Sequence, residues 1–346
     1  MKSFKCLAFI LLPCCLWASC ATKSEKPPKR SNSSHSVRTD AELPSRLKLS
    51  LKDTTLGLAV RQAGLETGGR FAVMNGLENL PIDRIAFNNA DFDAVAKKLS
   101  EKTGCAVQQC PSYYFLFWPG YESLTEVSFA DVAAQRFIQP VDRVAFGSGI
   151  PLYAVFAWLS QALHTTIIAD NAVAEAQCGE IALRDVPLAQ GVEAIVKTAR
   201  LVDTRVECTE HYMFIRAKDN RNPQSCLLSP ETLNERQRAH LEARTTVILP
   251  RPPDTPRRIE IEPGAAKLAE SLPTLSQQLG VPVVAEDDLS DFPVNPAAFM
   301  DVPVRVVMDL LIRQWLAPEF GYQFTSDRIV IRRRTPTELK RIEEAP

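Results

Sequence analysis

The chain has 346 residues, of which 45% are hydrophobic and 23% charged, a composition typical of roughly two or three folded domains. This balance excludes a collagen-like chain, a wholly disordered chain and a small disulfide-stabilised scaffold. Forty basic and 41 acidic residues leave a formal net charge of −1. Because no overall positive field attracts a polyanion, we expect no nucleic-acid partner.

The first twenty residues predict export from the cytoplasm. Two lysines precede an apolar stretch at residues 6–17, which is too short to span a bilayer as a helix. The sequence Ala18-Ser19-Cys20 then resembles the lipobox of bacterial lipoproteins, although Trp17 stands where that motif prefers leucine. We therefore expect residues 1–20 to be a lipoprotein signal peptide. The alternative is ordinary cleavage after Ala21, which would release a soluble periplasmic protein.

Residues 21–45 predict a flexible tether. They contain almost no large apolar side chain and many serine, proline and lysine residues, so they cannot bury enough surface to order themselves. Acyl chains on Cys20 would anchor this tether at the periplasmic face of the outer membrane. The folded part of the chain would then be held a short distance from the lipid.

Three stretches of the sequence align with one another without a gap: residues 54–92, 150–188 and 266–304. Leucine occupies the third position of all three, and apolar residues coincide at the seventh, eighteenth and thirty-fourth positions. The second stretch lies 96 residues after the first, and the third lies 116 residues after the second. Such internal similarity indicates a repeated structural unit.

Each copy predicts the same succession of elements. Alternating apolar and polar residues predict a half-buried strand, whereas apolar residues three and four apart predict an amphipathic helix. Aspartate or proline at the expected helix starts supports these boundaries. In the first copy, the predicted elements are strands at 46–52, 71–73 and 85–87, a helix from Asp91 and a strand at 113–118. In the second copy, they are a strand through Val144 and Phe146, a helix at 152–163, strands at 167–169 and 181–183, a helix from Pro187 and a hairpin of 204–208 with 212–215. A linker helix after Ser229-Pro230-Glu231 precedes the third copy, which has a strand at 258–262, a helix at 268–279, a helix from Pro303 and a hairpin of 321–324 with 329–331.

The predicted fold class is therefore α+β, with three tandem βαββαββ modules of about 75 residues each. The signal peptide and the tether precede the modules. The boundaries are 1–20 for the signal peptide, 21–45 for the tether, 46–122 for module 1, 142–217 for module 2, 218–257 for a linker with a short helix, 258–334 for module 3 and 335–346 for a tail.

The predicted modules resemble a known family. Residues 181–188 (IALRDVPL), the helix that follows and residues 205–215 (RVECTEHYMFI) are similar to the short N-terminal (STN) module of secretins and TonB-dependent receptors. Residues 297–331 carry the same pattern, and residues 85–117 carry it with Asn-Ala-Asp-Phe in place of Asp-Val-Pro-Leu. The resemblance implies periplasmic modules that bind other proteins or stack into rings and that have no catalytic activity.

This resemblance implies an assembly adaptor of an envelope system, such as a secretin, a pilus or a TonB-type system. Its partner would be a protein of the cell envelope, with self-assembly as a further option. The sequence carries no metal-ligand, phosphate-loop or nucleophile-elbow motif. We therefore expect no enzyme, no metal and no cofactor. The alternative function is a periplasmic or surface protein that binds a glycan or a peptide in a cleft between modules.

One candidate partner surface lies on the helix at 152–163. Tyr153, Ala157 and Trp158 lie off its core stripe, so this helix is apolar nearly all round. A second surface must cover such a helix, and that surface is an outside partner, module 1 or a linker.

A second candidate lies on the strand at 113–118, which has two apolar faces. Tyr114 and Leu116 share one face, and Trp118 follows on the same side. If this strand is exposed, it invites strand addition by a partner; if it is not, module 2 covers it.

Five cysteines follow Cys20, an odd number for a protein of an oxidising compartment. Cys178 and Cys208 are the pair that we consider the best candidate for a disulfide.

The predicted lipid anchor depends on a single thiol. Replacing Cys20→Ala should move the protein from the membrane fraction to the soluble fraction after cell lysis, because no acyl chain can then be attached. Fractionation followed by immunoblotting measures this. Unchanged membrane retention of the Cys20→Ala protein would contradict the lipoprotein prediction.

Overall fold

The computed structural model describes residues 46–68, 70–220, 226–227, 232–249 and 266–343. The predicted signal peptide, the tether with Cys20 and the predicted strand at 258–262 lie outside the described residues. Within the described part, the chain is a mixed α+β protein with helices and several small sheets, as the coarse fold class predicted.

In the first part of the described chain, strands and helices follow the apolar spacing from which they were predicted. Thr55 begins α1 by accepting a hydrogen bond from the backbone N–H of Leu58, and Gly68 ends this helix in the left-handed region. Asp91 caps α2 through the backbone N–H of Ala94. The elements are β1 (Leu47–Thr55), α1 (Leu56–Thr67), β2 (Phe71–Val73), β3 (Pro81–Ala90), α2 (Phe92–Thr103), β4 (Ala106–Gln109) and β5 (Tyr114–Phe117).

The middle part contains the helix that was predicted at 152–163. Leu152, Phe156 and Leu159 of this helix are buried, and His164 ends it in the left-handed region. The elements are η1 (Glu122–Glu126), α3 (Gln135–Ile138), β6 (Pro140–Phe146), α4 (Leu152–Leu163), β7 (Thr166–Ala169), α5 (Asn171–Ala174), β8 (Ile181–Pro187), α6 (Leu188–Thr198), β9 (Thr204–Cys208) and β10 (Tyr212–Ala217).

The last part differs from the prediction at the linker helix, at the strand that pairs with β15 and at the C-terminal helix. The linker helix begins later than predicted, because Asn234 and Gln237 form a reciprocal capping box. The strand that pairs with β15 is β11, which lies inside the predicted linker. The elements are α7 (Glu235–Glu242), β11 (Arg244–Ile248), β12 (Ala266–Lys267), α8 (Leu268–Leu279), β13 (Val283–Ala285), η3 (Asp287–Leu289), β14 (Pro293–Val294), β15 (Ala298–Pro303), α9 (Val304–Arg313), β16 (Phe320–Phe324), β17 (Ile329–Arg333) and α10 (Pro336–Glu343), the last within the predicted tail.

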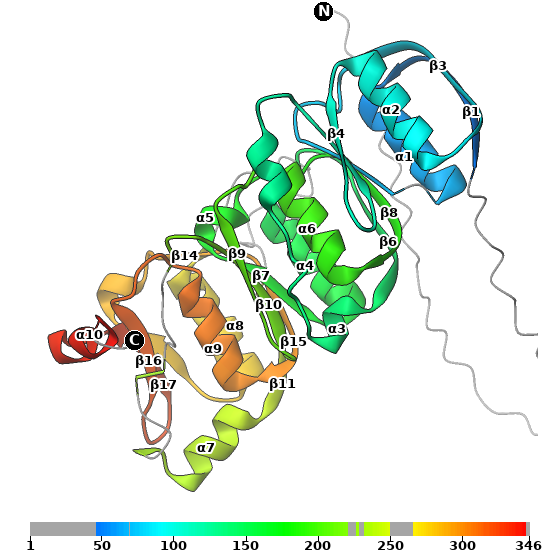
Figure 1. The fold of residues 1–346 in the computed structure, drawn as a ribbon. Coiled ribbons are helices and arrows are strands. Elements are labelled where there is room, and N and C mark those ends of the chain that lie inside the picture. Colours follow the sequence, from blue (N-terminus) through cyan, green and yellow to red (C-terminus); the bar gives the residue numbers. More distant parts are fainter. Residues whose placement is uncertain (1–45, 69, 221–225, 228–231, 250–265, 344–346) are drawn as a thin grey trace, which may run out of the picture. The chain divides into compact units, whose positions relative to one another are not determined.

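A five-stranded sheet in the order β4-β5-β2-β8-β6 joins the first and middle parts of the chain. β2 pairs in parallel with β5 and antiparallel with β8, with Phe71 opposite Ala182. The remaining sheets among the described residues include β7-β10-β9 and β13-β17-β16. β15 lies beside β7 (Figure 1), where the backbone N–H of Met300 donates to Thr166 Oγ1 at 2.9 Å.

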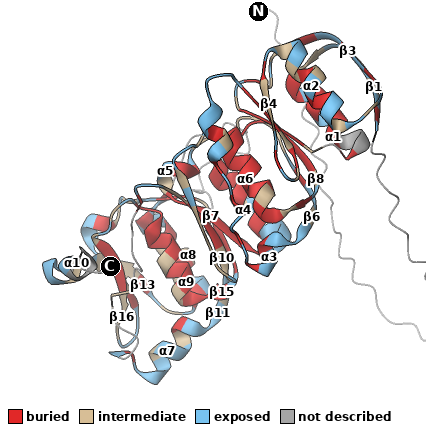
Figure 2. Cartoon of the chain, viewed as in Figure 1, coloured by how far each residue is buried: buried red, intermediate tan, exposed pale blue. Residues whose placement is uncertain are grey.

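The buried apolar residues form two clusters in the described part of the chain. One extends from β1 to β10, and the other extends from Leu233 to Ile331. Ile168 of β7 and Phe214 of β10 belong to the second cluster, so the middle part contributes to the core of the last part. Figure 2 shows that α4 and α6 are mostly buried, whereas α7 and α10 are mostly exposed or half-buried.

Gly179 allows the close approach of β2 to the segment that leads into β8. A Cβ atom at this position would lie 2.0 Å from the carbonyl oxygen of Val73 and 2.7 Å from the backbone nitrogen of Asn75. Both neighbours are backbone atoms, which cannot move aside without disturbing the β2–β8 pair. Glycine is therefore required here by packing rather than by its φ angle.

Replacing Gly179→Ala should lower the stability by about 1–3 kcal/mol, because the added methyl group forces the β2–β8 junction apart. Thermal unfolding measures the effect. Gly147→Ala is the matched control, because its Cβ would meet only the Arg61 guanidinium at 3.4 Å. Equal melting temperatures for the two variants would contradict this account of the junction.

Candidate interaction groove

Strand β9 is the edge of the three-stranded sheet β7-β10-β9. The backbone N–H of Lys218 donates to the carbonyl of Asp203, and the N–H of Thr209 donates to the carbonyl of Tyr212. Because hydrogen-bonded and non-hydrogen-bonded pairs alternate in an antiparallel ladder, the backbone groups of Thr204 and Val206 point away from β10. These backbone groups are thus directed towards the space beside the edge of β9.

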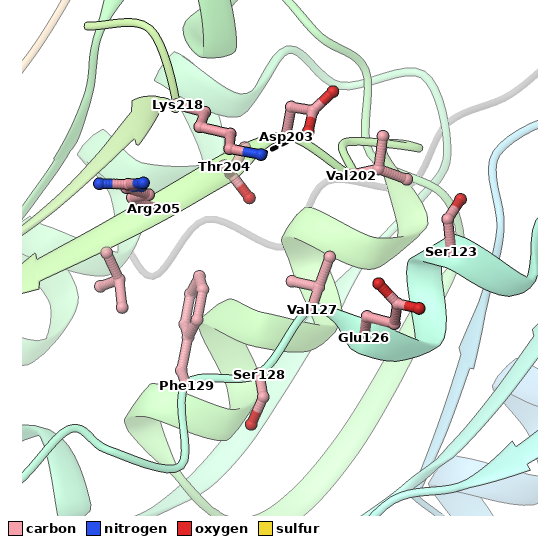
Figure 3. A pocket seen from close by; sticks show the side chains of 11 residues that line it. Ser123, Glu126, Val127, Ser128, Phe129, Val202, Asp203, Thr204, Arg205 and Lys218 are labelled. Atoms are coloured by element: carbon pink, nitrogen blue, oxygen red, sulfur yellow. Dashed lines mark ion pairs between the residues drawn. The ribbon is translucent and has the colours of Figure 1, made fainter.

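A polar groove of about 640 Å³ runs along this edge (Figure 3). One wall is Val202 to Val206 with Lys218, and the other wall is Ser123 with residues 126–129. We call residues 122–129 the strap. The groove volume lies within the ordinary range of ligand sites.

The strap is held in place by a buried polar cluster on α6. The Glu193 carboxylate accepts hydrogen bonds from the backbone N–H of Phe129 at 2.9 Å and from the Tyr113 hydroxyl at 2.6 Å. Lys197, one helical turn later, pairs with Glu193 at 3.1 Å and donates to Gln108 Oε1 at 3.2 Å. Burial and the neighbouring Glu193 charge raise the pKa of Tyr113 far above its usual value, so its hydroxyl remains a donor.

The groove offers several kinds of contact to a ligand. Lys218 lies 3.9 Å from Asp203 in a weak exposed ion pair, Arg205 and Glu126 add one charge of each sign, and Val202 is 41% exposed. An edge backbone and charges of both signs together fit an extended polypeptide.

The candidate surface on α4 divides into a covered part and an exposed part. Tyr153 is 6% exposed and packs beside Asn295 and Ala297, so the last part of the chain covers it. Ala157 is half-buried. Trp158 is 48% exposed and stacks on Phe146 with a centroid distance of 6.3 Å. Packing against the last part of the chain, rather than against module 1 or a linker as predicted, therefore accounts for Tyr153. Of these three residues, only Trp158 is largely accessible.

The strand-addition site predicted at β5 does not hold in the structure. β5 has β4 on one side and β2 on the other, so neither edge is open. Leu116 is fully buried, and the Tyr114 hydroxyl donates to Asp93 Oδ1 at 2.8 Å. Trp118, just beyond the strand, is 36% exposed. The alternative of cover by the chain itself is observed, because the sheet continues through β2 into β8.

The predicted disulfide is not formed in the structure. Cys178 and Cys208 are both free thiols. Cys178 precedes β8 in the five-stranded sheet and donates to the Gly147 carbonyl, whereas Cys208 ends β9 in the other sheet. The two cysteines therefore belong to different parts of the fold, and the predicted pair is not observed.

The described residues contain no group of three or more histidine, cysteine, aspartate or glutamate side chains placed to hold a metal ion. None of the described helices is long and apolar enough to cross a membrane. No protein-family model matches the chain, and neither a curated protein nor a solved structure matches it.

The two thiols should be unreactive in the folded protein. Burial raises the pKa of Cys178 to about 12, and burial together with the Glu210 charge raises the pKa of Cys208 to about 11. The reactive thiolate is therefore scarce at pH 8. Alkylation with iodoacetamide, followed by peptide mass spectrometry, should be slow for both residues in the native protein and fast in urea. A Cys178–Cys208 disulfide in the untreated protein would contradict this prediction.

Proposed function

We propose that the protein is a non-catalytic assembly adaptor of the bacterial envelope that captures an extended segment of a partner protein beside β9. The groove between this edge and the strap carries the proposal. Its outward backbone groups at Thr204 and Val206 match the strand-addition mode, in which main-chain hydrogen bonds supply affinity. Side-chain selectivity would come from Arg205, Lys218 and Glu126 along the groove walls.

Sequence features support the cellular setting of this proposal. The lipobox-like Ala18-Ser19-Cys20 and the polar tether would place the folded part at the periplasmic face of the outer membrane. The resemblance of residues 181–215 to STN modules favours a secretin, pilus or TonB-type partner. A soluble periplasmic protein remains the alternative if cleavage occurs after Ala21.

The finer architecture belongs to the same proposal: three related units in tandem. In support, the backbone N–H groups of Leu56, Leu152 and Leu268 each donate to a carbonyl 24 residues later, at 2.9, 2.9 and 2.8 Å. Each of these leucines is the first residue of a twelve-residue helix. The first strand of the third unit is then β11, because β11 pairs with β15 as β1 pairs with β3.

A second candidate function is the binding of a short peptide or a glycan in the same groove. The location of the groove between the strap and β9 favours it, because the strap belongs to the segment that joins the first two units. A glycan would use the charged and hydroxyl side chains but would not need the outward backbone N–H of Val206. Removing that N–H therefore separates glycan binding from strand addition by a polypeptide.

Replacing Val206→Pro should abolish capture of a protein partner by removing an outward N–H while leaving the β9–β10 hydrogen bonds in place. The measurement is cross-linking in the native cells from a photoreactive residue at Val202, followed by mass spectrometry. Val206→Thr is the matched control, because it keeps both the N–H and the β-branched shape.

A photoreactive residue at Leu316, which is 53% exposed and outside the groove, controls for random contact. An envelope protein linked from position 202, but not from 316, supports the adaptor. The same protein linked equally from a folded Val206→Pro variant would overturn strand addition at β9.

A further inference from the structure

Asn75 connects the first and middle parts of the chain. Its backbone N–H donates to the carbonyl of Thr198 at 2.8 Å, and its side-chain amide donates to the carbonyl of Gln177 at 3.2 Å. Just before it, the N–H of Val73 donates to the carbonyl of Glu180 at 2.8 Å. The residue at the end of a short strand thus holds the neighbouring segment by two hydrogen bonds.

Asn171 makes the same two contacts with the last part of the chain. Its backbone N–H donates to the carbonyl of Gln314 at 2.8 Å, and its side-chain amide donates to the carbonyl of Pro293 at 3.1 Å. Asn171 lies 96 residues after Asn75, and both acceptors lie 116 residues after those of Asn75. The two junctions therefore use one set of equivalent positions, with the same shifts as the aligned stretches.

The strands β8 and β15, against which the short strands β2 and β7 lie, each carry an alanine at the equivalent position. Ala182 of β8 lies opposite Phe71, and Ala298 of β15 is its equivalent 116 residues later. Both are buried, at 6% and 1% exposure. A small side chain at this position lets the short strand of the preceding unit approach closely.

Among the described residues, the first and last parts of the chain each carry one half of such a junction without a partner half. In the last part, the equivalent short strand is β13, which pairs with β17 alone among the described strands. All residues of β2 and β7 are buried, whereas Val284 and Ala285 of β13 are only half-buried. In the first part, the equivalent of Ala182 is Ala86 on β3, which is also an alanine but is exposed.

The two open halves carry opposite charges. Asp287 occupies the position of Asn75 and Asn171, and its carboxylate is exposed. Lys102, which occupies the position of Thr198, is exposed in the last turn of α2. Lys98 donates to the carbonyl of Ala86 at 2.6 Å in the single chain. Docking would require this ammonium to turn away from Ala86 and towards Asp287 of the second copy. Opposite charges at the two halves favour their association and set its direction.

We propose that the protein associates head to tail, with β13 and Asp287 of one copy docking on β3 and α2 of a second copy. The proposal rests on the three-unit organisation put forward above and names a second copy as the partner at this surface. Because the two surfaces differ, the contact is heterologous and builds chains or closed rings rather than a symmetric dimer. The groove beside β9 takes no part in this contact.

The test uses the full-length protein in detergent, with sedimentation velocity over a range of concentrations. Asp287→Lys and Ala86→Arg should each weaken self-association about tenfold or more, by charge repulsion and by blocking the strand edge. Mixing the two variants should give a one-to-one complex that grows no further, because each variant keeps one intact half. Matched controls are Asp327→Lys and Gln135→Arg, which introduce the same side chains at exposed positions outside both halves.

A monomeric wild-type protein at every concentration, or variants that associate as well as the controls, would overturn the proposal. Failure of the mixture to form the one-to-one complex would also overturn it, because a symmetric interface is not restored by mixing. The Val206→Pro variant should associate like the wild type. Loss of association at the ends and loss of partner capture at β9 are therefore separate outcomes.

Discussion

The structure depends on the antiparallel pairing of β2 with β8. This short contact turns two separate strand groups into one five-stranded sheet, and it satisfies backbone groups on the second edge of β2. Gly179 permits the close approach, and Arg61 reinforces it with two hydrogen bonds of 2.7 and 2.8 Å to Glu180. The Glu180 carboxylate raises the pKa of Arg61 further, although this guanidinium is charged in any case.

The position of the strap follows from a second constraint, the burial of Glu193 and Lys197. A buried ion pair recovers its desolvation cost only where further hydrogen bonds satisfy both partners. Here Tyr113, Gln108 and the backbone N–H of Phe129 provide them. The strap consequently lies at a fixed place beside α6, and the space between it and β9 becomes a groove rather than a packed core.

The functional proposals have one physical origin, which is a sheet edge that no described strand fills. At β2 the edge is filled by β8, and at β7 the neighbouring strand is β15. β9 has β10 on one side and a polar groove on the other, and β13 pairs with β17 alone among the described strands. An edge beside a polar groove suits an extended ligand. The edge of β13 is equivalent to the edges of β2 and β7, which β8 and β15 cover inside the chain. It therefore suits the equivalent strand, β3, of a second copy.

The sequence by itself determined the local elements. Helical spacing located α4 and α8, and Asp91, Pro187 and Pro303 marked the starts of later helices, because both signals arise from neighbours within one or two turns. Only the tertiary structure decided which edges are open, that β5 is interior and that Tyr153 is covered by Asn295 and Ala297. It also decided that β11, which lies inside the predicted linker, pairs with β15. Strand order and cover are set by contacts between residues far apart in the chain, and hydrophobic periodicity reports only which face of an element is buried, not what buries it.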